Sequence, residues 1–395
     1  MAMNSSRVEN WLVILRPALL MFAALFQFGA DDVCAQSDAK RDTKNVLEAL
    51  LIEADAVNTE KVAVWKKEGF TSLVIVLDER FDAGVYQRAA EAIATNALDV
   101  YYWIEVGRNP AFADEHPQWM ASLGSHNDWR KLFPDTTELQ EGEVAKAWPW
   151  TPIGYQKAFD AHLVRIKTLL ERLPSGYRGL LLNDLQGGPS SCGCGNLQCR
   201  WAIDYGVPAT AEKLAGHDIA AKFVIDVGKL AAGKVVIPVW TTECEQEDMA
   251  LEKQPQRDWT TGYCGDVDCF HYCLARFAEQ WNAFHETHRG PTGVLLLHKE
   301  FRRADAEYGP AASWITHAAQ YLEHKDLKRV TPQKLWLIVQ GYDVSPEEEK
   351  SARHAASQTG AAKVVVARTR IDQSYEPRIV RVKVEASAIK PSRIP

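Results

Sequence analysis

The sequence predicts an α/β fold in which eight parallel strands, each followed by a helix, close into a barrel. Three observations predict it. After residue 44 the chain alternates short apolar runs, rich in β-branched residues, with amphipathic stretches. The runs are continuously apolar, as strands buried on both faces require. Eight strand-then-helix units in a row imply parallel strands with right-handed crossovers, and eight units close into a (β/α)8 TIM barrel.

The helix patterns between these runs carry start and stop signals. "NTEKVAVWKKEG" has an Asn N-cap candidate and a Gly stop, and "SPEEEKSARHAASQTG" begins with Ser, Pro and acids and ends with Gly. "YQKAFDAHLVRIKTLLERLP" and "AASWITHAAQYLEH" carry apolar residues three and four apart. No G-x-G-x-x-G turn follows an early strand, so the competing open, doubly wound sheet has no dinucleotide site to support it. The expected strands are "LEALLIEA" (47–54), "SLVIVLDE" (72–79), "DVYYWIEV" (99–106), "RGLLLNDL" (178–185), "KVVIPVWTTE" (234–243), "GVLLLHKE" (293–300), "KLWLIVQGYD" (334–343) and "AKVVVARTR" (362–370).

The first 35 residues have the features of a signal peptide. Arg7 and Arg16 flank the positive region, and residues 17–30 supply the apolar stretch. Val33 and Ala35 place small residues at the positions that a cleavage site needs. The apolar stretch is too short to span a bilayer. We therefore expect a mature chain that begins at residue 36, is exported to the periplasm or the extracellular space, and has no membrane contact after cleavage.

Composition and charge narrow the class of protein. Of 395 residues, 46% are hydrophobic and 25% are charged, as is ordinary for a soluble globular protein. The net charge is -7 and no Lys/Arg cluster stands out, which argues against a nucleic-acid partner. We expect one barrel domain over residues 44–380 and a C-terminal tail over 381–395.

Three connections are expected to be long, those after strands 3, 4 and 5. The first, over 107–153, contains "HPQWM" and "AWPWTP", and the other two contain all seven cysteines of the mature chain. Loops that follow barrel strands lie at the C-terminal face, where barrel enzymes keep their active sites.

Carboxylates follow seven of the eight expected strands. This is more than the share of acids in an average chain predicts, although strand ends also become polar when they leave the core. Converging carboxylates suit acid/base catalysis or the binding of polyhydroxylated ligands. These acids are Glu53, Asp78, Glu105, Asp184, Glu243, Glu300 and Asp343.

Tryptophan is the second signal, with thirteen in the chain. An indole offers a flat apolar face and one N–H donor, which suits stacking on a sugar, although long loops also need aromatic residues for their own packing. The candidates for contact with a glycan are Trp103, Trp148, Trp150 and Trp240, with Trp148 and Trp150 as the exposed platform.

The stretch 99–120, "DVYYWIEVGRNPAFADEHPQWM", resembles the glycoside-hydrolase-like barrels of exported bacterial proteins. Its third strand ends in Trp-Ile-Glu and is followed by His-Pro-x-Trp, and a later strand ends at Asp184 just before a Cys-x-Cys stretch. The resemblance implies a (β/α)8 fold, cleavage or binding of an oligo- or polysaccharide, and catalytic carboxylates at the ends of strands 4 to 7. The strand 4 end reads "NDL" instead of Asn-Glu-Pro, and no D-x-x-D-x-D-x-E run is present, so the roles of the acids stay open.

We assign roles on this basis. Asp184 is expected to be nucleophile or stabiliser, with Glu243 or Glu300 as general acid, because neighbouring strands bring carboxyls to the ~5 to 9 Å separations of glycoside hydrolysis. No cofactor is required for this chemistry. Sugar hydroxyls are expected to contact Asp78, Glu105, Asp343 and His298.

The cysteines allow two structural interpretations. Cys192 and Cys194 are too close in sequence to bridge each other well, so disulfides would link the two loops. Alternatively, Cys192, Cys194 and Cys199, with Cys244 or a cysteine of the second cluster (264, 269 and 273), make a structural four-thiolate zinc site. A zinc knuckle of similar but shorter spacing occurs in one β-galactosidase family of barrels. Either interpretation ties loops together without catalysis.

Two alternative functions remain. The first is a glycan-binding barrel that has lost its catalytic acids. The second is a metal-dependent hydrolase that uses the Cys/His-rich loops, although no H-E-x-x-H motif and no paired histidines in the first strand support it. No G-x-S-x-G elbow is present for serine hydrolysis.

Overall fold

The computed structural model describes residues 46–107, 109–119, 156–183, 219–241, 284–296, 331–371 and 380–383, with short pieces between 135 and 154 and residues 185 and 315. Within it, eight strands form a closed barrel, and every neighbouring pair is parallel, from β1 beside β2 round to β9 beside β1. The predicted fold class is therefore confirmed. The barrel strands are β1 (Leu47–Ile52), β2 (Ser72–Val76), β3 (Asp99–Glu105), β5 (Gly179–Asn183), β6 (Val235–Thr241), β7 (Thr292–Leu296), β8 (Leu335–Gln340) and β9 (Lys363–Ala367).

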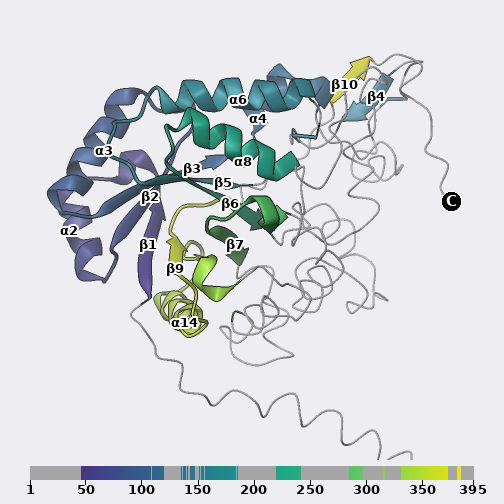
Figure 1. The fold of residues 1–395 in the computed structure, drawn as a ribbon. Coiled ribbons are helices and arrows are strands. Elements are labelled where there is room, and N and C mark those ends of the chain that lie inside the picture. The colour runs from purple at the N-terminus through teal and green to yellow at the C-terminus, as the bar shows by residue number, and fades with distance from the viewer. Residues whose placement is uncertain are drawn as a thin grey trace, which may run out of the picture. The chain divides into compact units, whose positions relative to one another are not determined.

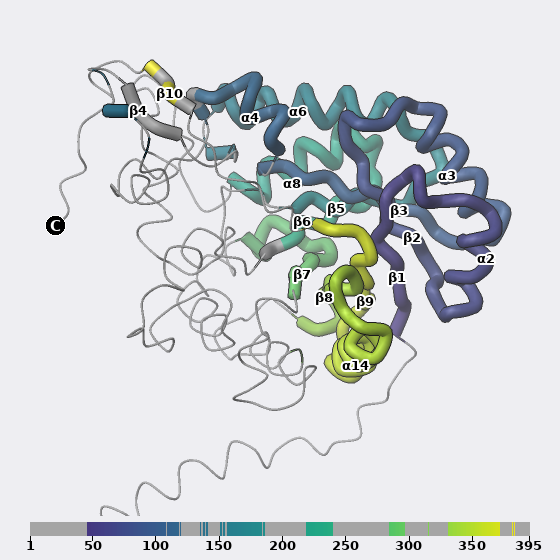
Figure 2. Tube along the Cα trace, turned by 180° about the vertical axis from the view of Figure 1, so that it is seen from behind, coloured from purple at the N-terminus to yellow at the C-terminus, as the bar shows by residue number. Residues whose placement is uncertain are grey.

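The described helices lie on the outside of the barrel strands, as Figures 1 and 2 show from opposite sides. Each of the long helices lies between two consecutive barrel strands in the chain, which is the connection that parallel neighbours require. The α-helices are α2 (Thr59–Lys67), α3 (Ala83–Thr95), α4 (Pro110–Glu115), α6 (Gln156–Leu170), α8 (Ile219–Leu230) and α14 (Pro346–Ser357), and the 3-10 turns are η1 (Ala54–Ala56), η2 (Pro117–Trp119) and η5 (Pro332–Lys334).

The helix boundaries follow the signals in the sequence. The Asn58 side chain accepts a hydrogen bond from the Lys61 N–H at the start of α2. Gly69, two residues past that helix, has φ 101°, a left-handed conformation that glycine adopts without steric cost. At α14, Ser345 and Glu348 form a reciprocal capping box. The pattern "AASWITHAAQYLEH" (311–324) lies outside the described residues, apart from residue 315.

Two apolar layers hold the barrel together. Side chains on one face of the strands fill the barrel interior, among them Leu51, Trp103 and Ile338. Side chains on the other face, such as Leu50 and Tyr102, pack against the helices. Because consecutive residues of a strand point to opposite faces, this division fixes which residues at each strand end face inward.

The N-terminal end of the interior holds a buried cation. Lys363, at the start of β9, is only 5% exposed, and its Nζ donates to Ser72 Oγ at 2.8 Å. The same Nζ lies 4.6 Å from the ring centre of Trp336 and 4.8 Å from that of Tyr101. Burial lowers the pKa of Lys363 to about 8.

The C-terminal segment pairs outside the barrel. β10 (Val380–Lys383) forms a two-stranded antiparallel sheet with β4 (Glu143–Lys146), which belongs to the long connection after β3. The predicted long loops after β5 and β6 lie mostly outside the described residues. None of the helices in the described ranges has the length and apolar character that crossing a bilayer requires.

Candidate functional site

The C-terminal mouth of the barrel is lined by a polar layer directly above the apolar interior. On β1, β2 and β3 the last interior apolar residues are Leu51, Val76 and Trp103. Two residues further along, the alternation of each strand places an acid inward. The same step gives an amide or a hydroxyl on three other strands. The resulting inward layer of described residues is Glu53, Asp78, Glu105, Asn183, Gln340 and Thr369.

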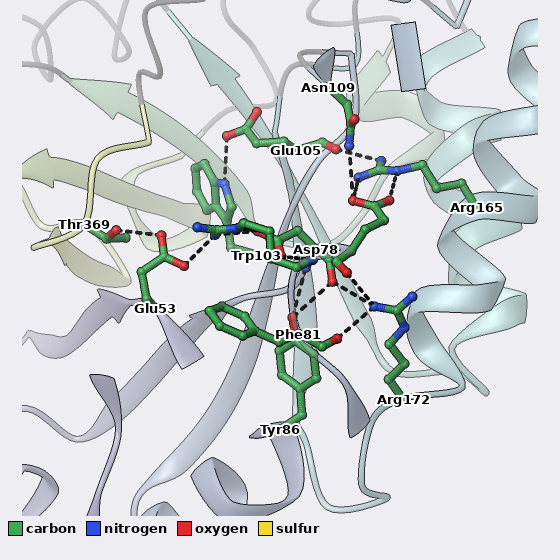
Figure 3. A network of polar contacts seen from close by, with 12 residues as sticks. Glu53, Asp78, Phe81, Tyr86, Trp103, Glu105, Asn109, Arg165, Arg172 and Thr369 are labelled. Carbon is green, nitrogen blue, oxygen red and sulfur yellow. Dashed lines mark hydrogen bonds and ion pairs between the residues drawn. The ribbon is translucent and has the colours of Figure 1, made fainter. Parts of the chain in front are cut away.

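Glu105 is held in one orientation by two neighbours. The Trp103 indole Nε1–H donates to Glu105 Oε1 at 2.8 Å (Figure 3). Asn183, which is Glu105's register partner on β5, donates its Nδ2 to Oε1 at 2.9 Å and to Oε2 at 3.0 Å. All three contacts require the carboxylate oxygens as acceptors, which suits an ionised group. Glu105 is half-buried, whereas Trp103 and Asn183 are 0% exposed.

A second group of mouth residues is joined through Arg80. Its Nε donates to Asp78 Oδ2 at 2.6 Å and its Nη2 to Glu53 Oε2 at 2.7 Å. Thr369 Oγ1 donates to the other Glu53 oxygen at 2.8 Å, as Figure 3 shows. One arginine therefore connects the acids that follow β1 and β2, and β9 contributes the hydroxyl.

Asp343 forms a separate ion pair. It has φ 53°, in the left-handed region, and its carboxylate contacts the guanidinium of Arg370. Both side chains are more than half exposed, so the pair adds little to stability. Asp343 follows β8 by three residues, and in the described structure its charge is balanced locally.

An outer layer fixes the main chain of the same strand ends. Arg165 of α6 donates from Nη1 to the Glu105 carbonyl at 2.8 Å and pairs through Nε with Glu79 Oε1 at 2.6 Å. Burial raises the pKa of Glu79, but the charge and hydrogen bonds of Arg165 outweigh burial, so the pKa lies below its usual value. Arg172 Nη1 donates to the carbonyls of Asp78 and Phe81 at 3.3 and 2.8 Å. Arg165 and Arg172 reach these strand ends from one side of the barrel (Figure 3).

The structure brings part of the predicted site together. Asp78, Glu105 and Trp103 lie at the mouth, where the sequence placed them. Trp103 is fully buried and its indole N–H serves Glu105, so its position corrects the expectation of a stacking face for a sugar. The remaining predicted residues lie outside the described ranges: Asp184, Glu243, Glu300, His298, Trp148, Trp150, Cys192, Cys194, Cys199 and Cys244. Trp240 is in β6, but its side chain is not described.

The sequence analysis missed three mouth residues, Asn183, Arg80 and Thr369. The prediction considered acidic side chains only, whereas these three residues are hydrogen-bond or ion-pair partners of the acids. The signal for Asn183 was present, because counting by twos from the apolar Leu181 reaches it. In the described part of the chain, no group of three or more candidate metal ligands is close enough to hold an ion.

Comparison with known proteins shows neither a family nor an activity for this chain. The sequence matches no protein-family model. It also matches no curated protein. Among solved structures, similar chains include an α-amylase from Lactobacillus plantarum (9% identity, TM-score 0.41, covering 82% of this chain and 71% of that one). A xyloglucan-specific β-1,4-glucanase from a ruminal metagenomic library has 9% identity and a TM-score of 0.35, covering 78% and 77%. Dihydropteroate synthase from Thermus thermophilus has 10% identity and a TM-score of 0.33, covering 82% and 90%.

Proposed function

We propose that this chain is an exported barrel enzyme that cleaves an oligo- or polysaccharide by paired-carboxylate acid/base catalysis at the C-terminal mouth. The observation that carries the proposal is Glu105, an acid oriented by the Trp103 indole and the Asn183 amide at the end of β3. Barrel enzymes have their catalytic residues at the C-terminal ends of the barrel strands, which is where Glu105 lies.

The described acids differ in what they can contribute. Arg80 pairs with both Glu53 and Asp78, and Arg370 pairs with Asp343, so these acids suit binding to sugar hydroxyls. Glu105 accepts hydrogen bonds from two neutral groups, the Trp103 indole and the Asn183 amide. Glycoside hydrolysis needs one ionised and one protonated carboxyl, about 5 to 9.5 Å apart. We assign Asp184 as nucleophile or stabiliser and Glu243 or Glu300 as general acid, with Glu105 as a fixed acceptor for sugar hydroxyls.

Substitution of the proposed acids tests the chemistry. Wild type is first assayed against a panel of neutral and charged oligosaccharides, with reducing ends as the readout. Asp184→Asn and Glu243→Gln or Glu300→Gln are expected to lower kcat by about 10²- to 10⁴-fold, the usual contribution of an acid or base. Glu60→Gln, an exposed acid in the first turn of α2, is the matched control and is expected to retain full activity.

Three outcomes decide between the alternatives. Loss of activity in the acid variants with unchanged folding supports the assignment. Cleavage that persists in every acid variant means that the residues are wrong. Glycan binding by wild type without cleavage of any substrate favours the glycan-binding barrel, since such a protein keeps the mouth without the chemistry.

Removal of the Asn183 amide tests the orientation of Glu105 separately. Asn183→Ala deletes the donor to both Glu105 oxygens and leaves the acid in place. We expect kcat to fall with a smaller change in KM, because a misoriented carboxylate still binds hydroxyls. If only KM changes, Glu105 serves binding alone.

N-terminal sequencing of the exported protein tests the signal peptide, and a mature chain that starts at Gln36 is expected.

A further inference from the structure

We propose a second binding site, outside the barrel wall, for a small organic monoanion with an apolar body. It is a pocket of about 410 Å³ between α4, α6 and the exit of β2, called here the outer pocket. This volume is within the usual range for small-molecule sites. The pocket is lined chiefly by Phe112, His116, Val164, Thr168, Arg165 and Arg172. Glu79 and Glu115 also line it. It does not depend on the proposed function at the mouth.

Arg172 is the group that points to an anion. Its Nη1 donates to three main-chain carbonyls, those of Asp78, Glu79 and Phe81, at 3.3, 3.3 and 2.8 Å. These acceptors are neutral, and across the described residues no carboxylate pairs with Arg172. Its Nε and Nη2 make no hydrogen bond with any described residue. Two N–H groups of one guanidinium match the two oxygens of a carboxylate.

The other arginine of the pocket is already neutralised. Arg165 pairs with Glu79 at 2.6 Å and is only 8% exposed, so it belongs to the wall. The remaining charges, Arg172 and Glu115, are of opposite sign. The described lining therefore carries two arginines and two glutamates, whose formal charges cancel. A ligand with one negative charge fits such a lining better than a phosphate with two.

The rest of the wall is apolar. Ala111, Ala161 and Leu169 line the pocket together with Phe112 and Val164. Val164 is 66% exposed, so its side chain is open to solvent. The Thr168 hydroxyl donates to the Val164 carbonyl at 3.2 Å, so it stays within the helix. Apolar walls with one converging cation are typical of sites for amphipathic acids.

The outer pocket lies directly behind the mouth. Arg165 and Arg172, which line it, hold the carbonyls of Glu105 and Asp78, whose side chains face the barrel interior on the other side of the same strands. Figure 3 shows both arginines reaching these strand ends. A ligand on Arg172 would therefore contact the residues that fix the two strand ends.

The test uses the full mature chain with 4-phenylbutyrate as the probe and 4-phenylbutyramide as its uncharged match. The acid is expected to raise the Tm progressively with concentration, because a ligand that binds only the folded state stabilises it. The amide is expected to bind at least tenfold more weakly, since it lacks the charge that Arg172 recognises.

Two variants and a control locate the binding. Arg172→Gln removes the cation, and Val164→Trp fills the pocket from an exposed position, where the folding cost is small. Both are expected to lower the affinity for 4-phenylbutyrate at least tenfold. Arg178→Gln changes an arginine that is 65% exposed and pairs with Asp99 away from the pocket, and it is expected to bind like wild type.

Several results would overturn the proposal. They are the absence of any response of wild type to the acid, equal binding of acid and amide, or unchanged binding in Val164→Trp. If Arg172→Gln does not fold because the carbonyls after β2 lose their donor, Val164→Trp and the amide still decide. Activity at the mouth is not the readout, so failure here leaves the glycan proposal untouched.

Discussion

Replacement of Lys363 by methionine is expected to stabilise the protein at neutral pH. The lysine is buried in the barrel interior, and burial lowers its pKa from 10.5 to about 8. At pH 7 the side chain is charged in both the folded and unfolded states. The folded state must therefore hold the charged ammonium group of Lys363 in a buried environment, which costs free energy.

The magnitude follows from the pKa shift and the neighbouring groups. A difference between 10.5 and about 8 corresponds to about 3 kcal/mol of unfavourable burial at pH 7. The faces of Trp336 and Tyr101 attract the ammonium group and offset about 1–2 kcal/mol of this cost. Methionine has similar length and no charge. We expect the free energy of unfolding of Lys363→Met to exceed that of wild type by about 1–2 kcal/mol.

The pH dependence distinguishes this mechanism from simple repacking. Between pH 8 and 10.5 the unfolded chain binds more protons at Lys363 than the folded chain, so wild type gains stability as the pH rises through this window. The methionine variant lacks that gain. The difference between the two proteins is therefore expected to be largest at pH 7 and to shrink by pH 9.5.

Urea unfolding followed by tryptophan fluorescence, at pH 7 and 9.5, measures the effect. Lys67→Met, an exposed lysine at the end of α2, is the control and is expected to leave stability unchanged. The reasoning would be refuted if Lys363→Met were less stable than wild type at pH 7, or if the difference did not depend on pH. The first result would mean that the contacts of Lys363 with Ser72 and the two aromatic rings outweigh the cost of burial, and the second that burial does not lower the pKa of Lys363.

Three further predictions concern other parts of the chain. Burial lowers the pKa of His162 to about 3, so wild type is expected to lose about 2 kcal/mol between pH 7 and 5 as the unfolded imidazole protonates, and urea unfolding of His162→Gln is expected to lack most of this loss. Ser345→Ala removes the N-cap bond to the Glu348 N–H and is expected to cost about 1 kcal/mol in the same assay, with an unchanged stability arguing against a role in the cap. Mass spectrometry with a thiol count on the exported protein should find one zinc per chain, or no metal with a single free thiol; iron would contradict the glycosidase proposal.

The barrel could be predicted because its signals are local and repeated. Each strand is a short run of β-branched and other apolar residues, such as 72–76 and 363–367, and such continuous runs are typical of parallel strands buried on both faces. Helix starts were equally readable, since Asn58 and Ser345 act as caps within four residues of their partners. Closure of the barrel required only the number of units and their right-handed connections.

The pairing of charges could not be predicted in the same way. Arg80 reaches Glu53 across 27 residues of sequence, and Thr369 reaches Glu53 from the other end of the chain. Such contacts depend on which strands become neighbours after closure and on the rotamer of a long side chain. A strand-end acid therefore looked the same in the sequence whether an arginine neutralised it or not.

At the end of β5, the prediction from sequence favoured the acid Asp184, whereas the alternation of the strand turns Asn183 inward. The expected site took Asp184 from the "NDL" strand end because a carboxylate can act as a nucleophile and an amide cannot. Yet β5 places Leu181 in the barrel interior, and the alternation makes Asn183 the next inward residue, where its amide donates to Glu105. Substitution of an amide that orients an acid is expected to affect activity differently from substitution of an acid that attacks a sugar. Asn183→Ala should spare the reacting group and lower kcat through Glu105, whereas Asp184→Asn should remove the group itself. Comparison of these two variants therefore separates an inward residue that positions the site from an adjacent residue that reacts in it.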